Sequence, residues 1–291
     1  MSDYIKGRIF IVGCPRSGTT LLQSFLTAHS EVESFPESQF FLSLDHNSPL
    51  LSLMRIASPK AKDRLSEFLS HIDSKETSET TVTHALFKQQ YIRKFTLALD
   101  TLTKKNGKRV WLEKSPRHLI CIKEIERSVH KAKFIHIIRD GADVVASIYD
   151  AALKYPNTGW ESYQDIDQCV YLWTKYKSIS ERYRYRPNHI IVHYESLVSD
   201  TRISLNRVCD FINIKYEEEI LSSYKDSYKK IVNKDELWKS GINSSTISYN
   251  RNKFNEIFDR SQQEYILKKL SMGFSETHLQ KLKRKIKDTV F

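Results

Sequence analysis

The chain has 291 residues, of which 40% are hydrophobic, 28% charged and 11% aromatic, a composition that indicates a globular protein and excludes fibrous and wholly disordered chains. Lysine and arginine outnumber aspartate and glutamate by 46 to 35, which gives a net charge of +11. A polyanionic ligand, an anionic acceptor or a nucleic acid is therefore a partner to consider.

Short apolar strands alternate with amphipathic segments along the chain, which predicts an α/β fold with a central, mainly parallel sheet. The predicted strands are Arg8–Val12, Arg109–Leu112, Lys133–Arg139 and Ile190–His193. The predicted helices are Thr19–His29, Arg117–Val129, Gly141–Leu153 and Thr201–Ile212.

We expect a single domain, 1–291, whose core comprises about residues 8–39 and 107–215. A helical insertion at about 40–106 contains a polar loop, Asp73–Thr81, followed by a helix from His84 to about Lys104. A helical C-terminal portion covers about 216–291 and includes a loop at Lys239–Thr246.

Residues 9–20 read IFIVGCPRSGTT, a strand followed by Gly13, Gly18 and two threonines. This spacing matches a phosphate-binding loop, in which backbone N–H groups and a helix N-terminus form a nest for an anion. A loop for nucleoside triphosphates has lysine where this chain has Thr19, and the one strong cation, Arg16, lies inside the loop. The sequence therefore predicts an anion site and argues against a magnesium-dependent kinase.

A second anion site is predicted in FIHIIRDGADVVASIY, residues 134–149. Arg139 ends a buried strand where a helix begins, and the positive end of that helix favours an anion. Ser147 lies eight residues on, a little over two helical turns, so it can approach the same crevice. The alternatives are an ion pair of Arg139 with Asp140 or Asp143, and a bond from Ser147 to its own helix backbone.

Together these motifs resemble the sulfotransferases that use 3′-phosphoadenosine-5′-phosphosulfate (PAPS) as donor. GCPRSGTTLL resembles their 5′-phosphosulfate loop, and the Arg139–Ser147 pair resembles their 3′-phosphate site. The resemblance implies a P-loop-like three-layer fold and a 5′ site formed by Pro15, Arg16, Ser17, Gly18, Thr19 and Thr20. An anion nest with one arginine suits this donor without magnesium, and none of the ten histidines has metal-ligand spacing, so we expect no metal.

The segment AHSEVESFPESQFF resembles the part of protein-tyrosine sulfotransferases and their bacterial relatives that carries a catalytic glutamate. The matching residues are Ala28, His29, Val32 and Glu37. The resemblance implies that Glu37 is the base that removes the acceptor's proton. A solvated acidic loop is the alternative for this segment.

VWLEKSPRHL, residues 110–119, is a predicted strand followed by a Ser-Pro helix start, with Ser115 as the expected cap. Lys114 stands at the end of the strand, where open α/β sheets bind ligands. The resemblance implies that Lys114, together with Arg16, stabilises charge on the leaving phosphate. A surface lysine is the alternative, and Glu113 and His118 are further candidates for the base.

In the family a loop near the C-terminus covers the nucleotide. Its counterpart here is Ser248-Tyr249-Asn250-Arg251, which implies donor contacts from Ser248 and Arg251; for Arg251 a plain surface position is the alternative. The acceptor site has no motif, and we expect it in the 40–106 insertion and the helical C-terminal portion. Candidates for an acceptor pocket, or for the core, are Tyr155, Trp160, Tyr163 and Trp173.

We therefore expect a PAPS-dependent sulfotransferase that acts on a hydroxyl or an amine of a small-molecule or carbohydrate acceptor. The alternatives are a P-loop kinase that uses Mg·ATP and a non-catalytic protein that binds a polyanion. The apolar run before Gly13 is too short for a secretory signal, no stretch has the length of a membrane span, and the four cysteines form no CxxC pair. We expect a cytoplasmic protein with neither nucleic acid nor membrane as partner.

Overall fold

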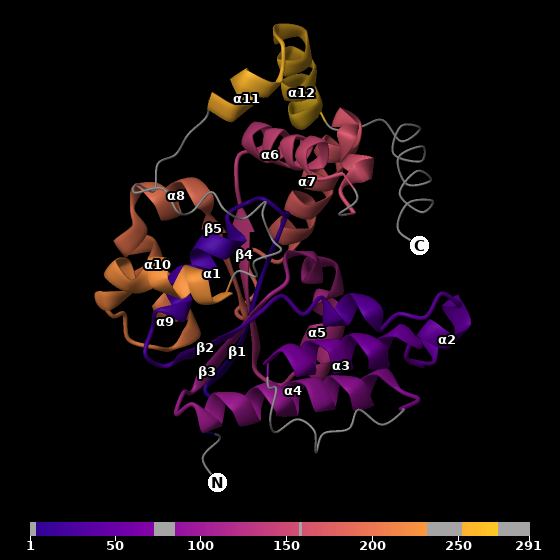
Figure 1. Ribbon diagram of the computed structural model, residues 1–291, viewed down its shortest axis with the longest axis vertical. Coiled ribbons are helices and arrows are strands. Elements are labelled where there is room, and N and C mark those ends of the chain that lie inside the picture. Colours follow the sequence, from indigo (N-terminus) through magenta and orange to yellow (C-terminus); the bar gives the residue numbers. More distant parts are fainter. Residues whose placement is uncertain (1–3, 73–84, 157–158, 232–251, 273–291) are drawn as a thin grey trace.

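The centre of the fold is a parallel five-stranded sheet with the strand order β2-β3-β1-β4-β5 (Figure 1). The computed structural model describes residues 4–72, 85–156, 159–231 and 252–272. The strands are β1 (Gly7–Gly13), β2 (Val32–Phe35), β3 (Val110–Lys114), β4 (Ala132–Ile138) and β5 (His189–His193). The α/β class and the parallel sheet predicted from the sequence are confirmed, and β2 is an additional strand that was not predicted.

β1 lies in the middle of the sheet, and all seven of its residues are buried. Side chains alternate between the two faces of a strand. Phe10 and Val12 therefore belong to the core on one face, and Ile9 and Ile11 to the core on the other. Burial on both faces explains why this strand reads as a continuous apolar run.

Helices cover both faces of the sheet. The face of Ile9 and Ile11 packs against α1 (Thr19–Thr27), α8 (Tyr194–Ser199), α9 (Thr201–Ile212) and α10 (Glu219–Ile231). The core on the face of Phe10 and Val12 includes α3 (Lys60–Ile72), α4 (Lys88–Lys105), α5 (Ile122–Ser128), α6 (Gly141–Lys154) and α7 (Ile166–Arg182). Helix α9 has the predicted bounds, and α1 and α6 begin where predicted.

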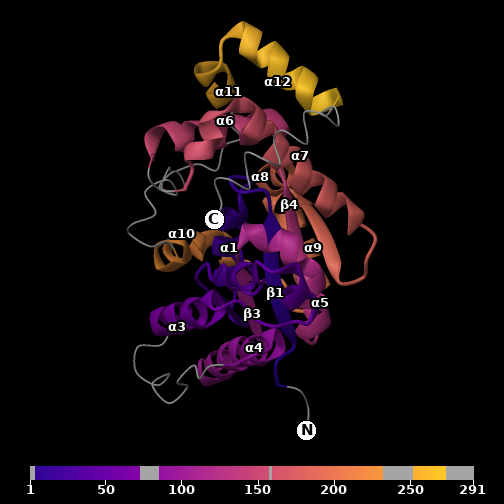
Figure 2. The ribbon, with the colours of Figure 1, turned by 90° about the vertical axis from the view of Figure 1, so that its right-hand side faces the viewer.

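The 40–106 insertion is helical in its described part. Its elements are η1 (Phe40–Ser43), α2 (Pro49–Leu53), α3 and α4. Figures 1 and 2 show α3 and α4 side by side at the lower end of the molecule, where Phe68 of α3 stacks on Phe95 of α4. The predicted loop Asp73–Thr81 lies outside the described residues.

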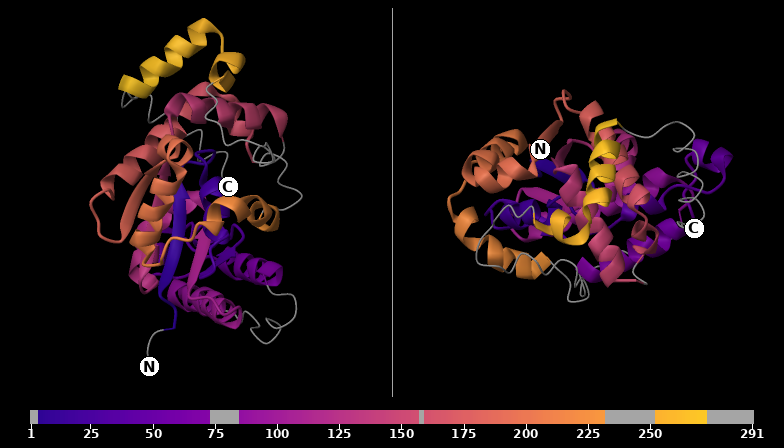
Figure 3. Two further views of the ribbon diagram at one scale, coloured as in Figure 1. Left: turned by 90° about the vertical axis from the view of Figure 1, so that its left-hand side faces the viewer. Right: turned by 90° about the horizontal axis from the view of Figure 1, so that it is seen from above.

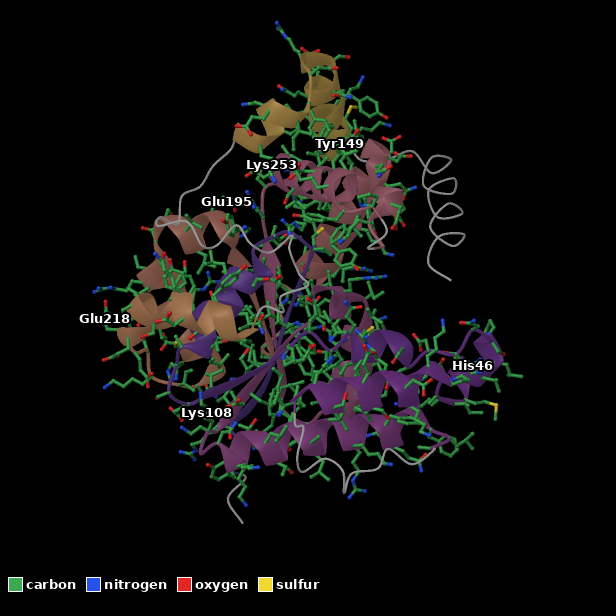
Figure 4. The ribbon with its side chains drawn as sticks, in the orientation of Figure 1. His46, Lys108, Tyr149, Glu195, Glu218 and Lys253 are labelled. Carbon is green, nitrogen blue, oxygen red and sulfur yellow. The ribbon has the colours of Figure 1, made fainter. Side chains whose placement is uncertain are left out.

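The described C-terminal helices α11 (Asn252–Ile257) and α12 (Arg260–Met272) lie over α6 at the other end of the molecule (Figure 3). Lys253 of α11 donates to Asp150 Oδ2 of α6 at 2.6 Å, and Tyr149 packs on Phe258; Figure 4 labels Lys253 and Tyr149. The predicted loop Lys239–Thr246 lies outside the described residues. None of the described helices is both long and apolar enough to cross a membrane.

Candidate functional site

A cavity of about 220 Å³ opens where β1, β3 and β4 end. We call it the strand-end cavity. β1 lies between β3 and β4, so the strand order reverses at β1: the chain first adds strands on one side of it and then on the other. Open α/β sheets bind ligands at such a switch point, outside the carboxyl ends of the strands. The predicted site residues in its wall are Pro15, Arg16, Gly18, Thr19, Thr20, Glu37, Lys114, Arg139 and Ser147.

The loop between β1 and α1 adopts the backbone of an anion nest. Arg16 has φ 71° and Gly18, the N-cap of α1, has φ 94°, so both residues are left-handed. A Cβ atom on Gly18 would lie 2.3 Å from Tyr194 Cδ2, so glycine is required on two grounds. The leading N–H groups of a helix have no acceptor within the helix, and here they start at the cavity wall.

Ser17 differs from its neighbours in the loop. Its backbone N–H donates to Cys14 O at 3.2 Å, and the residue lines a small void beneath the loop instead of the strand-end cavity. Ser17 Oγ is buried and has no hydrogen-bond partner in the described part of the chain. The structure therefore does not bring Ser17 to the cavity, although the resemblance included it among the donor-binding residues.

Two arginines from different elements meet in the cavity. Arg16 Nε donates to Ser147 Oγ of α6 at 3.1 Å. Burial, and then the positive charge of Arg139, lower the pKa of Arg16 below its ordinary value. An arginine stays protonated under such conditions. Two half-buried positive charges in one cavity would be stabilised by an anion between them.

Arg139 follows β4 and is held on two sides. Its Nη2 lies 3.4 Å from Asp143 Oδ2, and its guanidinium carbon lies 4.5 Å from the centre of the Tyr194 ring. The ion pair with Asp143 is thus present, but it leaves Arg139 Nε buried and without a hydrogen-bond partner among the described residues. An orphaned buried donor on a cation is a feature that an anionic ligand would satisfy.

Lys114 and Glu37 form the opposite wall. Lys114 Nζ donates to Glu37 Oε2 at 2.9 Å, and the lysine side chain is only 3% exposed. The surface-lysine alternative is therefore wrong. The side chain of Glu37 is 21% exposed, so solvent and ligands can reach the carboxylate. A carboxylate beside a buried ammonium at a cavity wall can accept a proton from a bound hydroxyl.

The loop that carries Glu37 is fastened to the end of β3. Glu113 Oε1 accepts hydrogen bonds from Ser38 N at 3.0 Å and Ser38 Oγ at 2.8 Å. Ser115 Oγ donates to the same oxygen at 2.5 Å and accepts from Gln39 N at 2.9 Å. Ser115 occupies the predicted N-cap position of the 3₁₀ helix η3 (Pro116–Cys121), but its side chain makes no capping bond.

Glu113 and His118 are both fully buried and bonded to each other, Oε2 to Nδ1, at 3.1 Å. Since Phe41 N donates to His118 Nε2 at 3.2 Å, the proton of the imidazole is on Nδ1 and points to Glu113. Burial alone would raise the pKa of Glu113, but His118, Ser115 and Ser38 together lower it below its ordinary value. Both are fully buried and neither lines the strand-end cavity, so both are excluded as alternative bases.

Residues 8–218 match the model of the sulfotransferase family. The chain belongs to this family. Protein-tyrosine sulfotransferase A of Caenorhabditis elegans is 26% identical over 244 residues, covering 78% of this chain and 54% of that protein. Protein-tyrosine sulfotransferase 1 of Danio rerio is 25% identical over 219 residues, covering 73% and 55%. The chain thus spans about half the length of these curated relatives.

Solved structures of sulfotransferases share the fold. The sulfotransferase domain of the olefin synthase from Synechococcus PCC 7002 superposes with a TM-score of 0.57 at 20% identity, covering 92% of this chain and 96% of that one. Mouse sulfotransferase SULT7A1 complexed with PAP superposes with a TM-score of 0.51 at 15% identity, covering 97% and 91%. The P-loop-like fold expected from the sequence is confirmed.

Sequence reasoning missed Leu21, Pro116 and Tyr194 among the residues that line the cavity of this sulfotransferase-family chain, and Tyr194 has the most contacts with the predicted site residues. Tyr194 lines the strand-end cavity, stacks on Arg139 and closes against Gly18. Its position directly after β5, at the same edge of the sheet as Lys114 and Arg139, was the available signal. Glu195, beside it, accepts from Asp140 N at 2.8 Å and so ties α8 to the start of α6; Figure 4 labels Glu195 on that side.

The two tryptophans named as acceptor-pocket candidates lie in different places. Trp160 lines the strand-end cavity, whereas Trp173 is buried in the core and donates from Nε1 to Arg139 O at 3.0 Å. Ser248 and Arg251 lie outside the described residues. Within the described ranges, no group of three or more His, Cys, Asp or Glu side chains is arranged to hold a metal ion.

Proposed function

We propose that this sulfotransferase-family protein transfers a sulfuryl group from PAPS to a hydroxyl or an amine of a small acceptor and releases adenosine 3′,5′-bisphosphate (PAP). The observation that carries the proposal is the strand-end cavity, in which an anion nest, two arginines and a lysine–glutamate pair meet. A sulfotransferase of the same fold has been solved in complex with PAP. PAPS would supply the sulfuryl group on a 5′-phosphate, which becomes the leaving group.

The cavity residues divide into two anion sites. The loop residues Pro15, Arg16 and Gly18, with Thr19 and Thr20 at the start of α1, suit the 5′ end of the donor, because the nest and Arg16 lie there. Arg139 and Ser147 suit the 3′-phosphate, since Arg139 Nε is a buried donor without a partner in the described chain. The Arg16–Ser147 hydrogen bond holds the two sites in one arrangement.

The chemistry that the protein supplies is proton removal and charge stabilisation. Glu37 would accept the proton of the acceptor group as it attacks sulfur, because its carboxylate is part of the cavity wall and partly exposed. Lys114 keeps that carboxylate oriented at 2.9 Å, and its buried ammonium, with Arg16, would stabilise the negative charge left on the departing phosphate. Positioning and fixed charges would supply much of the rate, as they do in phosphoryl transfer.

The assignment of Arg139 to the 3′-phosphate is tested with two nucleotides. In Arg139→Ala we expect PAP affinity to fall by roughly tenfold to a hundredfold, because a hydrogen bond between charged groups is lost. AMP lacks the 3′-phosphate and should lose much less. Arg202→Ala removes an equal charge from the exposed surface of α9, where Arg202 pairs with Glu218, and should change neither affinity. Calorimetric titration that finds equal losses for PAP and AMP in Arg139→Ala would contradict the assignment.

A further inference from the structure

A second cavity, of about 450 Å³, lies on the other side of Glu37. We call it the insertion cavity, because two of its walls are helices of the 40–106 insertion. It extends from Glu37 down the outer side of β2 to Asn106, the C-cap of α4, and α3 forms its long wall. Glu37 lines both this cavity and the strand-end cavity.

This arrangement separates two binding spaces by the proposed base. A base must come within hydrogen-bond distance of the proton that it removes, so the reacting group of the acceptor has to meet Glu37. Other walls of the strand-end cavity carry the residues that we propose bind the donor, among them Arg16, Arg139 and Ser147. The insertion cavity has the size of a small-molecule site, and it provides a route to the same carboxylate.

The charges of the insertion cavity limit the class of acceptor. Three of its wall residues are carboxylates, Glu33, Glu37 and Glu67. The one arginine, Arg64, already donates from Nε to Ser38 O at 2.8 Å and from Nη1 to Glu67 Oε2 at 2.9 Å. Each of the three carboxylates has a cation partner, Lys108, Lys114 or Arg64, but of these cations only Arg64 is itself in the cavity wall. An acidic acceptor would therefore face more carboxylates than cations there.

Lys108 is not in the cavity wall, but it lies close to the wall residue Glu33. Lys108, labelled at the lower end of the sheet in Figure 4, donates to Val32 O at 2.6 Å and lies 4.0 Å from Glu33 Oε2. The ammonium group of Lys108 therefore interacts with β2 and with Glu33, outside the space of the cavity. Phe35, Phe68 and Leu102 add apolar surface between the polar groups. Apolar patches flanked by carboxylates and an amide suit a sugar ring, which has apolar faces and a rim of hydroxyl groups.

We propose that the insertion cavity is the acceptor site and that it takes a neutral or amine-bearing sugar of one or two rings. This proposal rests on the proposed function, because it assigns the group that Glu37 would deprotonate. It predicts that an acidic tyrosine peptide is a poor acceptor, although the relatives named above are protein-tyrosine sulfotransferases. The carboxylates would accept hydrogen bonds from hydroxyl and ammonium groups of the sugar.

The test uses the full chain saturated with PAP, so that binding is measured without turnover. Calorimetry with cellobiose, chitobiose and a tyrosine peptide flanked by glutamates should detect at least one disaccharide and a peptide affinity at least tenfold weaker. With PAPS, release of PAP should increase with the same disaccharide.

Two variants place the sugar in this cavity. Asn106→Trp fills the lower end of the cavity, and Glu67→Lys reverses a charge on its long wall. Both are exposed positions, and both changes should weaken disaccharide binding at least tenfold while PAP stabilises the protein as in the wild type. Glu219→Lys makes the same charge change at an exposed position of α10 and should leave binding unchanged.

The outcomes test the acceptor class, the location of the acceptor site and the proposed function separately. If PAP binds but no disaccharide does, or if the acidic peptide binds better, the acceptor class is wrong. If a disaccharide binds equally to the wild type and both variants, it binds elsewhere, and the insertion cavity is not the acceptor site. If PAP itself does not bind, the proposed function fails, whatever the acceptor results are.

Discussion

At the scale of single residues, the proposed chemistry depends on the pair formed by Glu37 and Lys114. The two side chains come from different elements, the loop after β2 and the end of β3, and they meet at 2.9 Å. Lys114 is buried and Glu37 is partly exposed. The ammonium thus holds an accessible carboxylate in place, where it can accept a proton from a group bound in the cavity.

Replacing the base should therefore separate catalysis from donor binding. In Glu37→Gln we expect sulfuryl transfer to fall by about a hundredfold or more, the usual contribution of a general base. Thermal stabilisation by PAP should stay as in the wild type, since Glu37 belongs to neither of the proposed phosphate sites. Glu31→Gln is a matched control, because Glu31 lies in the same acidic segment but pairs with Lys6 at 2.7 Å. Retained transfer in Glu37→Gln would remove Glu37 as the base.

Most of the cavity residues could be predicted from the sequence, because a glycine-rich loop and the ends of parallel strands have to meet at one edge of the sheet. Arg16, Arg139 and Lys114 were found in this way. Tyr194 and the bond from Ser115 to Glu113 were missed. The position of Tyr194 after β5 indicated the right edge of the sheet, but its contact with Arg139 and the Ser115–Glu113 bond depend on which side chains face each other across the crevice, and no local pattern carries that information.

At the scale of elements, the network around Glu113 explains how the Glu37 loop is kept in place. Gln39 has φ 49°, a left-handed conformation that costs free energy in a residue other than glycine. Its N–H donates a hydrogen bond to Ser115 Oγ, and the neighbouring N–H of Ser38 donates to Glu113 Oε1. The buried end of β3 thus holds a strained loop in a defined position.

Glu113→Gln should loosen that loop. The oxygen of the new side chain still accepts from Ser38, but its amide nitrogen faces the proton on His118 Nδ1. If the proton moved to His118 Nε2 instead, it would point at the N–H of Phe41, which then has no acceptor. In either case one buried donor is left without a hydrogen bond, at a cost of about 1–3 kcal/mol.

We expect a lower denaturant midpoint and slower transfer in Glu113→Gln, with PAP binding retained. Glu124→Gln breaks a partly exposed pair with Arg55 and should cost less than about 1 kcal/mol without slowing transfer. Unchanged transfer in Glu113→Gln, at a measurable loss of stability, would limit Glu113 to a role in folding.

A second buried chain of polar groups joins β4 and β5 to the helices on one face. Ser180 Oγ lies 3.1 Å from His136 Nδ1, His136 Nε2 lies 2.8 Å from His189 Nδ1, and His189 Nε2 lies 3.0 Å from Glu126 Oε1. If each imidazole carries one proton, on Nε2, then Ser180 donates to His136, His136 donates to His189 and His189 donates to Glu126, so each of these polar groups has a hydrogen-bond partner. Burial, and then the neighbouring His189, lower the pKa of His136 to about 3.

The protein should consequently lose stability in mild acid. Below the ordinary histidine pKa of about 6.5 the unfolded chain takes up a proton that folded His136 does not, so stability falls as pH decreases from 6.5 toward 3. At pH 5 this amounts to about 2 kcal/mol, because each pKa unit corresponds to about 1.4 kcal/mol.

Denaturant unfolding at pH 7 and pH 5 measures this loss. His136→Phe should show a smaller difference between the two pH values, whereas His46→Phe, at a partly exposed position shortly before α2 in the chain (labelled in Figure 4), should behave as the wild type. Equal acid sensitivity of His136→Phe and the wild type would contradict the role assigned to His136.

The elements themselves were predicted unequally. Strands buried on both faces, such as β1 and β4, have long apolar runs and were found within a residue or so. β2 has only four residues, VESF, and two of them are half-buried and polar. It is a strand because it pairs with β3 at the edge of the sheet, and pairing across more than seventy residues of chain leaves no mark in the local sequence.

At the scale of the whole molecule, the strand order is what brings the site together. β1 carries the anion loop, and its two neighbours carry Lys114 and Arg139 at their ends. The insertion then folds beside β2 and forms a second cavity next to Glu37. The sequence predicted the alternation of strands and helices, but the arrangement of the insertion around β2 depends on side-chain packing between α3 and α4.

The most direct test of the account is thermal stabilisation by PAP, with AMP and Mg·ATP as comparators and no metal added for the first two. At about 100 times its dissociation constant, a ligand that binds only the folded protein adds roughly 2.7 kcal/mol to the free energy of unfolding. We expect PAP to raise the melting temperature clearly, AMP to raise it less, and Mg·ATP to give no shift as large as that of PAP. A shift with Mg·ATP alone would contradict the assignment of both phosphate sites and would identify the strand-end cavity as the site of a kinase.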